Sequence, residues 1–239
     1  MELLEAPCRV INLDRNPERW EVCEQRLREA GFKNFKRVRG VDATNAAELQ
    51  KEWNALGNPP FAAWDQEFIS YPGKQGCFLS HVKLWQEIVA TGMERMVILE
   101  DDVMFHKEWQ VLVEEYYKNT PKDYEVLYLG AQFEFPSQHH IDRGPVFCTH
   151  AMVVTLSGAK KLLGLVLGNA NGVYTVDCMV IDAMKDYYRR LRLNRAVNMP
   201  FVWYVWNGFH REEMPKGWTK RNCGLVYQDE AFGSEVRPW

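Results

Sequence analysis

The run MVILEDDV, residues 96–103, constrains the fold of this chain more than any other segment. Its first half is uninterrupted apolar sequence, which predicts a strand buried on both faces, as in a parallel sheet. Glu100, Asp101 and Asp102 follow at once. Three adjacent carboxylates at the edge of a core repel one another and raise one another's pKa. We therefore expect a positive charge near this strand end that offsets them.

Hydrophobic periodicity predicts alternating strands and helices along the rest of the chain. The β-α-β opening favours a parallel sheet. We predict one α/β domain over residues 1–239, with a mostly parallel central sheet flanked by helices, an irregular insertion at 43–73 that holds a short helix at 45–55, and an irregular tail at 208–239. Further strands are expected at 8–13, 35–42, 125–130 and 148–156, helices at 17–30, 73–92, 107–118, 157–167 and 176–191, and a last extended region that ends near 206.

Composition narrows the classes of function. The chain is 46% hydrophobic and 26% charged with a net charge of −3, which is typical of a soluble globular protein and does not favour nucleic-acid binding. None of the six cysteines forms a C-x-x-C pair, so we do not expect a zinc site. No apolar stretch reaches the roughly 18 residues of a membrane span, and the N-terminus does not resemble a signal peptide.

The carboxylates after residue 99 are candidate metal ligands. Ligands of open α/β sheets bind at the carboxyl ends of the strands, where Asp14 and the three carboxylates fall. Strand side chains alternate, so Glu100 and Asp102 are expected to share a face and Asp101 to point elsewhere. Mg²⁺ and Mn²⁺ typically take one or two carboxylates plus phosphate oxygens, and the cation would remove the repulsion. The alternative is an acidic cap or a solvated turn.

A family resemblance rests on motifs that occur in order over roughly residues 8–205. They are INLDRNPERW, GKQGCFLSHVKLWQEIV, MVILEDDV, LYLG, CTHAMVVTLSGAKKLL and VDCMVID. Together they resemble glycosyltransferase family 25, which includes bacterial lipopolysaccharide sugar transferases, animal collagen galactosyltransferases and counterparts in large DNA viruses. The resemblance implies a GT-A-like fold, a nucleotide-sugar donor, inversion at the anomeric carbon and a divalent metal, usually Mn²⁺, at the acidic motif.

The resemblance also implies donor-binding roles at two strand ends. Asp14 would accept hydrogen bonds from ribose or uracil, and Arg15 or Arg19 would meet phosphate. The alternatives are that Asp14 caps the following helix and that Arg39 lies on a solvated face. The donor-binding set predicted at these strand ends comprises Asn12, Leu13, Asp14, Arg15, Arg39, Asp42 and Asp101.

The helix predicted at 73–92 adds a second group of donor-binding candidates. Gly73 and Gly76 are expected to open it, so that backbone amides approach an anion while Lys74 adds positive charge. Ser80 and His81 fit the family motif and are assigned to the donor site. The alternative for His81 is a core histidine on an apolar helix face.

An inverting transfer needs a base that takes the proton of the acceptor hydroxyl. Asp177, near the start of the helix at 176–191, is the first candidate, and a simple helix cap is its alternative. His150 is placed with it in the catalytic set, as a residue that binds the donor sugar or the acceptor together with Thr149. His210 is a third candidate metal ligand.

The predicted function is an inverting, metal-dependent transfer of a hexose from UDP-galactose or UDP-glucose to a glycan, lipid-linked glycan or glycoprotein. Two rival functions are a catalytically silent carbohydrate- or partner-binding relative and a metal-dependent nucleotide-sugar phosphohydrolase. Trp203, Trp206 and Trp218 would suit a sugar-stacking surface, which favours the transferase. The arginine cluster at 189–195 is a solvated face or a contact with an anionic acceptor or membrane. We expect a cytoplasmic protein of bacterial or viral origin, soluble or peripheral to a membrane.

Overall fold

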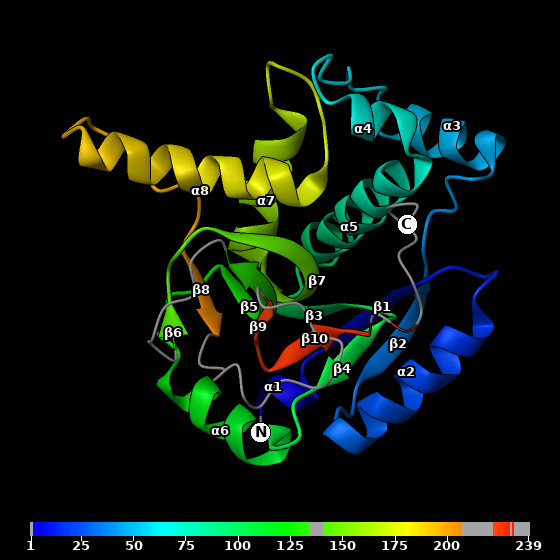
Figure 1. The fold of residues 1–239 in the computed structure, drawn as a ribbon, viewed down its shortest axis with the longest axis vertical. Helices are drawn as coiled ribbons and strands as arrows, with labels where there is room; N and C mark the ends of the chain where they lie inside the picture. The colour runs from blue at the N-terminus through cyan, green and yellow to red at the C-terminus, as the bar shows by residue number, and fades with distance from the viewer. Residues whose placement is uncertain (1, 134–140, 207–221, 230, 232–239) are drawn as a thin grey trace.

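The structure is a computed structural model that describes residues 2–133, 141–206, 222–229 and 231. A mixed β-sheet with the order β2-β1-β3-β7-β5-β8-β6 forms its centre, and β9 also pairs with β5 (Figure 1). A separate pair joins β4 to β10. The strands are β1 (Cys8–Asn12), β2 (Phe35–Arg39), β3 (Arg95–Glu100), β4 (Val103–Phe105), β5 (Val126–Phe133), β6 (Ile141–Asp142), β7 (Val146–Thr155), β8 (Trp203–Trp206), β9 (Asn222–Gly224) and β10 (Val226–Gln228).

The pairings fix the direction of each strand in the large sheet. Among the described strands, β1, β2, β3, β5 and β8 run one way, while β6, β7 and β9 run against them. The parallel pairing of β2, β1 and β3 confirms the β-α-β opening. The predicted α/β class, with a mostly parallel central sheet flanked by helices, is therefore confirmed.

Helices cover both faces of the sheet (Figure 1). α5, α7 and α8 lie on one face, and α1, α2 and α6 lie on the other. None of the described helices is both long and apolar enough to cross a bilayer. The helices are α1 (Glu2–Glu5), α2 (Pro17–Ala30), α3 (Ala46–Ala55), α4 (Gln66–Ser70), α5 (Pro72–Thr91), α6 (Trp109–Asn119), α7 (Leu156–Leu167) and α8 (Val176–Arg192).

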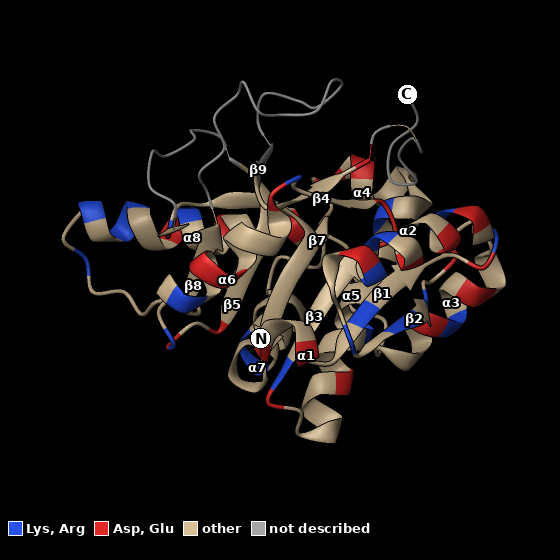
Figure 2. Ribbon diagram, turned by 90° about the horizontal axis from the view of Figure 1, so that it is seen from below, with Lys and Arg blue, Asp and Glu red and all other residues tan. Residues whose placement is uncertain are grey.

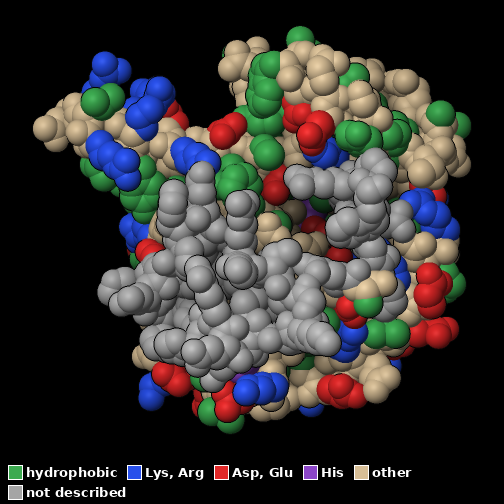
Figure 3. All heavy atoms as spheres, viewed as in Figure 1, with side chains coloured by type: hydrophobic (Ala, Val, Ile, Leu, Met, Phe, Trp, Pro, Cys, Tyr) green, Lys and Arg blue, Asp and Glu red, His purple; other side chains and the backbone are tan. Residues whose placement is uncertain are grey.

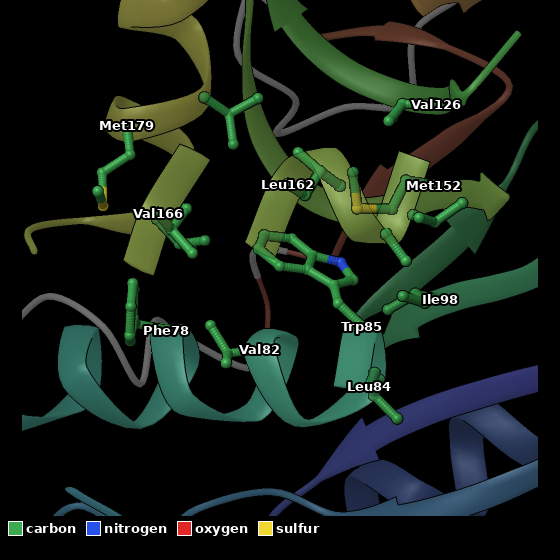
Figure 4. Packing of buried hydrophobic residues seen from close by; sticks show 14 of the residues in the cluster. Phe78, Val82, Leu84, Trp85, Ile98, Val126, Met152, Leu162, Val166 and Met179 are labelled. Atoms are coloured by element: carbon green, nitrogen blue, oxygen red, sulfur yellow. The ribbon is translucent and has the colours of Figure 1, made fainter. Parts of the chain in front are cut away.

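Strand β3 shows how the sequence pattern builds the two layers. Met96 and Ile98 belong to the core on the α5 side, whereas Val97 and Leu99 belong to the core on the α2 side. Strand side chains alternate between faces, so an unbroken apolar run fills both cores. Figure 4 shows Ile98 beside Trp85 of α5 in the first of these cores.

The tight packing of α5 against the sheet also explains one of its glycines. A Cβ atom at Gly76 would lie 2.5 Å from the carbonyl oxygen of Val41, which is too close for any larger residue without movement. α5 begins at Pro72, so Gly76 lies inside the helix, and the prediction that Gly73 and Gly76 open it is wrong for Gly76. The lack of a side chain at Gly76 allows α5 to pack closely against the backbone that follows β2.

Other differences from the sequence prediction concern short elements and aromatic residues. The insertion at 43–73 contains a second helix, α4, and the tail predicted as irregular contains β9 and β10. The short strand β4 was not predicted from the sequence. Trp203 and Trp206 are fully buried core residues, so the prediction that they form a sugar-stacking surface is wrong. Trp218 lies outside the described residues.

The backbone of strand β10 lies directly against Gly130 of β5. A Cβ atom at Gly130 would lie 1.8 Å from the carbonyl oxygen of Val226 and 2.8 Å from Nε2 of His150. We predict that Gly130→Ala lowers the free energy of unfolding by about 1–3 kcal/mol or more, because the backbone of β10 must move away. The measurement is urea denaturation followed by circular dichroism.

Gly164 in α7 provides the matched control. A Cβ atom there meets nothing within 4 Å, and the position is an exposed helical one. Gly164→Ala is expected to stabilise the protein by roughly 0.5–1 kcal/mol through helix propensity. Equal effects of the two substitutions would contradict the close contact between β5 and β10.

Candidate active site at the carboxyl ends of the strands

The carboxyl ends of β1, β2 and β3 lie side by side. Asn12 at the end of β1 is in register with Arg39 of β2, and Ile11 is in register with Glu100 of β3. The donor-side candidates after β1 and β2 and the acidic run after β3 therefore meet at one edge of the sheet. This is the edge at which open α/β sheets bind ligands.

Glu100 continues the alternation of β3 and faces α5. Its Oε1 atom lies 3.1 Å from Nε2 of His81 and accepts a hydrogen bond from Thr149 of β7 at 3.5 Å. Burial alone would raise the pKa of Glu100, but the hydrogen bond and charge of His81 outweigh that effect and hold it below its ordinary value. His81 is fully buried, and its Nδ1 atom has no hydrogen-bond partner among the described residues.

Asp101 points to the opposite side of the sheet edge, toward α2. Its Oδ1 atom pairs with Arg19 at 2.5 Å, and its Oδ2 atom accepts a hydrogen bond from Nδ2 of Asn12 at 2.6 Å. Arg19 and Asn12 are both buried. Asp101 thus has its own counter-ion. A donor-binding role for Asp101 stays a prediction, and it requires the donor to share Asp101 with Arg19 and Asn12.

Asp102 is the least satisfied of the three carboxylates. Its Oδ2 atom lies 3.4 Å from Arg19 and accepts a hydrogen bond from Gln228 at 3.3 Å, while its buried Oδ1 atom has no partner among the described residues. Burial raises the pKa of Asp102 to about 8, and the negative charge of Glu100 adds to the increase. The backbone amide of Asp229 also donates to its carbonyl oxygen, at 2.6 Å.

The charges around these carboxylates fit a divalent cation. Among the described residues, one guanidinium, that of Arg19, pairs with Asp101 and Asp102, whereas Glu100 contacts the imidazole of His81 and the hydroxyl of Thr149. If all three carboxylates are ionised, their negative charge exceeds the charge of the guanidinium by two units with a neutral His81 and by one unit with a protonated His81. Carboxylate oxygens such as the unpartnered Oδ1 of Asp102 are ligands that Mg²⁺ and Mn²⁺ accept. Glu100 and Asp102 therefore fit the predicted metal site.

The counter-ion for Asp101 was not identified from the sequence, which considered Arg19 only as a phosphate contact. Arg19 shares the buried face of α2 with Cys23 and Leu27, at a spacing of four residues. An arginine at the regular position of an apolar face was the signal that could have indicated an internal ion pair. Contacts from Gln228 had no sequence signal, because they depend on how β10 returns to β4.

The residues after β1 and β2 form an exposed ion-pair network instead of an open pocket. Asp14 accepts hydrogen bonds from Arg37 at 2.5 Å and from Arg39 at 2.7 Å, and Arg39 also pairs with Glu48 of α3. The Arg37 guanidinium, with help from Arg39, holds the pKa of Asp14 below its ordinary value. Asp14 does not cap α2, because the N-cap position of that helix is Asn16.

A second part of this network lies beside the first. Arg15 forms an ion pair with Asp42, and Asp42 also accepts hydrogen bonds from the amide and hydroxyl of Thr44. Leu13 is partly buried and lies against Gly40. The donor-binding roles of these residues stay predictions. A bound nucleotide would have to replace their present ion pair and hydrogen bonds with contacts of its own.

On α5, the predicted anion-binding groups have partners within the protein. Lys74 is buried and pairs with Glu67 of α4. Ser80 accepts a hydrogen bond from the amide of Val41 at 2.9 Å and donates to the carbonyl oxygen of Gly76 at 2.7 Å. Both contacts tie α5 to its neighbours, and contact of these residues with a donor stays a prediction.

Asp177 joins the start of α8 to β7. Its Oδ2 atom accepts a hydrogen bond from the amide of Cys148 at 3.2 Å, and its Oδ1 atom accepts one from the amide of Cys178 at 2.9 Å. Cys148 has a φ of 71°, a left-handed conformation that is uncommon for residues other than glycine and occurs often at functional sites. Asp177 is partly exposed and close enough to Cys77 of α5 to raise the pKa of that thiol.

His150 is buried more deeply than we expect for a residue that contacts an acceptor substrate. Its side chain is buried, and Nε2 lies 3.2 Å from the carbonyl oxygen of Val226, to which it donates in the neutral form. Burial lowers the pKa of His150, which favours that neutral form. Asp182, five residues after Asp177 on α8, accepts a hydrogen bond from Tyr174. His210 lies outside the described residues.

The space-filling view and the ribbon coloured by charge show where acidic and basic residues gather. Figure 3 shows a hollow with a histidine and acidic side chains at its floor. In the ribbon of Figure 2, the far end of α8 carries the colour of Lys and Arg. Two of them, Arg189 and Arg190, pair with Asp186, as expected for a solvated helix face.

A sequence profile identifies the family. The profile described as glycosyltransferase family 25 (LPS biosynthesis protein) matches residues 6–143, which is more than half of the chain. This stretch contains the strand ends of β1, β2 and β3 and the acidic run. The chain belongs to glycosyltransferase family 25.

Curated relatives carry two kinds of name. The chain is 31% identical over 172 residues to procollagen galactosyltransferase 1 of Danio rerio, which covers 64% of this chain and 28% of the relative. It is 28% identical over 172 residues to procollagen galactosyltransferase 2 of Mus musculus, with 65% and 27% covered. It is also 29% identical over 169 residues to the probable inactive glycosyltransferase 25 family member 3 of Bos taurus, with 64% and 28% covered.

The chain thus spans little more than a quarter of the length of these relatives. The solved structures that match this chain have lower sequence identity. One is a glycosyltransferase involved in the glycosylation of the major capsid of PBCV-1, at 9% identity and a TM-score of 0.38, with 67% of this chain and 66% of that chain covered. Another is mouse xyloside xylosyltransferase 1, at 12% identity and a TM-score of 0.39, with 88% and 99% covered.

We predict that Arg19→Met lowers the free energy of unfolding by about 3–5 kcal/mol when metal is chelated, because Asp101 is left buried without its counter-ion. Asp101→Asn in the same chain should recover part of the loss, since it removes the unpaired charge. The control is Arg28→Met, which removes an exposed partner of Glu24 and should cost less than about 1 kcal/mol. Equal effects of the two arginine substitutions in urea denaturation would contradict the internal ion pair.

Proposed function

We propose that this chain is an inverting, metal-dependent hexosyltransferase that takes its sugar from a UDP-sugar donor. The observation that carries the proposal is the pair of partly exposed Glu100 and buried Asp102, whose Oδ1 atom has no partner among the described residues, at the strand edge of a family 25 chain. Galactose is the favoured hexose because related chains are named procollagen galactosyltransferases, and glucose is the alternative. The acceptor is a glycan, a lipid-linked glycan or a glycoprotein. A cytoplasmic location stays a prediction.

In this proposal the side chains at the strand edge hold the donor. Glu100 and Asp102 hold the cation, Mn²⁺ or Mg²⁺, and Arg19 and Asn12 keep Asp101 in place beside them. The bound cation supplies positive charge against the donor's diphosphate as that group leaves. Asp14 and Arg15, at the end of β1, contact the nucleoside and phosphates by exchanging their present partners.

Asp177 is the proposed base. The acceptor oxygen forms a bond to the anomeric carbon from the face opposite the diphosphate, the bond from that carbon to the diphosphate breaks, and the hydroxyl proton passes to Asp177. The hydrogen bonds from Cys148 and Cys178 fix the carboxylate between β7 and α8. Its partial exposure leaves it accessible to an acceptor. His150 supports this wall of the site from inside, by its contact with β10.

The names of the relatives leave a silent binding module as the second candidate, since some family members are called inactive. The acidic site favours the enzyme, because a buried carboxylate with an unpartnered oxygen destabilises a fold unless a cation joins it. A phosphohydrolase would use the same carboxylates. It differs in its product, since it releases a sugar phosphate, whereas a transferase releases the whole diphosphate from the sugar.

We predict that a UDP-hexose raises the melting temperature only when Mn²⁺ or Mg²⁺ is present. A ligand at about 100 times its Kd adds roughly 2.7 kcal/mol, or several degrees for a chain of this size. Asp102→Asn should abolish the shift and keep the fold, because asparagine resembles the protonated carboxyl that burial favours at this position. Thermal denaturation with UDP-, GDP- and CMP-sugars, with and without EDTA, measures the effect.

The matched control is Asp186→Asn, which changes an exposed carboxylate on α8 far along the helix from Asp177. It should keep the full shift. A shift of the same size in EDTA, or in Asp102→Asn, would remove Asp102 from the proposed cation site.

A second prediction concerns the base. Asp177→Asn should keep the donor-dependent shift and lower kcat by roughly 10²–10⁴-fold, because the amide cannot take the acceptor proton. Release of UDP in the presence of candidate acceptors measures the rate. Loss of donor binding together with a lower melting temperature would instead assign Asp177 the purely structural role of tying α8 to β7.

A further inference from the structure

A second set of metal-binding atoms lies on the α5 side of Glu100. The Sγ atom of Cys77, a ring nitrogen of His81 and a carboxylate oxygen of Glu100 all lie within 4.8 Å of one another. Cys77 and His81 are four residues apart on α5, so they lie on the same helix face, one turn from each other. Glu100 reaches them because the alternation of β3 directs it to that face.

The surroundings of this group favour a cation. The carboxylates of Glu100 and Asp177 both act on Cys77 through their charge. Negative charge that disfavours a free thiolate stabilises a cation bound to that thiolate. Asp102, which is only 8% exposed and whose Oδ1 atom has no partner in the part of the chain that the structure describes, also acts on Cys77 through its charge. These carboxylates come from β3, the turn after it and α8.

The site is also reachable from solvent. Cys77 is partly exposed, and the side chain of Glu100 is 21% exposed, whereas His81 is fully buried behind them. A cation could therefore enter past Glu100 and Cys77 without opening the core. The present spacing of up to 4.8 Å would have to shorten to about 3.5 Å for the three ligand atoms to surround one ion.

We propose that Cys77, His81 and Glu100 form a binding site for a borderline-soft divalent cation such as Zn²⁺ or Co²⁺. The cation bonds to Sγ of Cys77, and the thiol proton leaves to solvent as that bond forms. His81 binds through its neutral ring nitrogen and Glu100 through a carboxylate oxygen, and a fourth position stays open toward the hollow. Sulfur and imidazole ligands select Zn²⁺ and Co²⁺ over Mg²⁺.

This inference does not rest on the proposed transferase activity. It concerns metal binding by the chain alone, with Glu100 as the residue that both cation sites would use. It also changes an expectation from the sequence, which excluded zinc because no C-x-x-C pair is present. Cysteine spacing cannot indicate a site whose other ligands are a histidine on the same helix and a glutamate on a strand.

The experiment is a titration of EDTA-treated, desalted protein with Co²⁺, without nucleotide sugar, followed by absorption spectroscopy. Thiolate bound to Co²⁺ gives a near-ultraviolet charge-transfer band that oxygen ligands do not give. We expect this band to saturate at one Co²⁺ per chain and Zn²⁺ to displace it. Cys77→Ser should abolish the band and weaken Co²⁺ binding by at least about tenfold.

Cys178→Ser is the matched control, because Cys178 is another free, partly buried thiol outside the group. It should keep the band. His81→Gln should weaken binding and shift the band, and melting in EDTA shows that each variant is folded. Co²⁺ binding without a charge-transfer band, a band that survives Cys77→Ser, or no Co²⁺ binding overturns the proposal. None of these results depends on whether the protein transfers a sugar.

Discussion

The alternation of side chains along β3 is the constraint on which the site depends. Because the strand is buried on both faces, its register cannot slip by one residue without exposing one core and filling the other with polar groups. The carboxylates that follow inherit this register. Glu100 is directed to α5, where it meets His81, and Asp101 is directed to α2, where it meets Arg19. The core therefore sets the geometry of the acidic residues.

Arg19 stabilises the three adjacent carboxylates but does not neutralise all of their negative charge. A buried ion pair gives little net stability, because both groups lose their hydration, but an unpaired buried carboxylate is far more costly. Arg19 satisfies Asp101 closely, at 2.5 Å, and reaches Asp102 only at 3.4 Å. The pKa of Glu100 is held low by His81 and that of Asp102 is raised by burial to about 8, so the remaining negative charge lies mainly at Glu100. The ion pair thus separates a structural carboxylate from two that are available to a ligand.

The sequence predicted what depends on local pattern. The order of the main strands and helices followed from periodicity, and α2, α3 and α6 lie within a few residues of their predicted ranges. Trp203 and Trp206 show the limit, because a tryptophan has the same local signal in a core as on a sugar-binding surface. The partners of Asp102 from β10 also had no local signal, since a separation of over a hundred residues carries no pattern.

Family membership alone does not decide whether such a chain is an enzyme, because its relatives include proteins named as galactosyltransferases and as inactive. The local charge balance bears on that question more directly. A chain without a cation at this edge would gain stability from a neutral residue at Asp102, where burial already raises the pKa to about 8. Burial disfavours the ionised form of Asp102, and the cation of the proposed function would offset that cost. This charge balance bears on the proposed cation binding independently of which sugar or acceptor the protein uses.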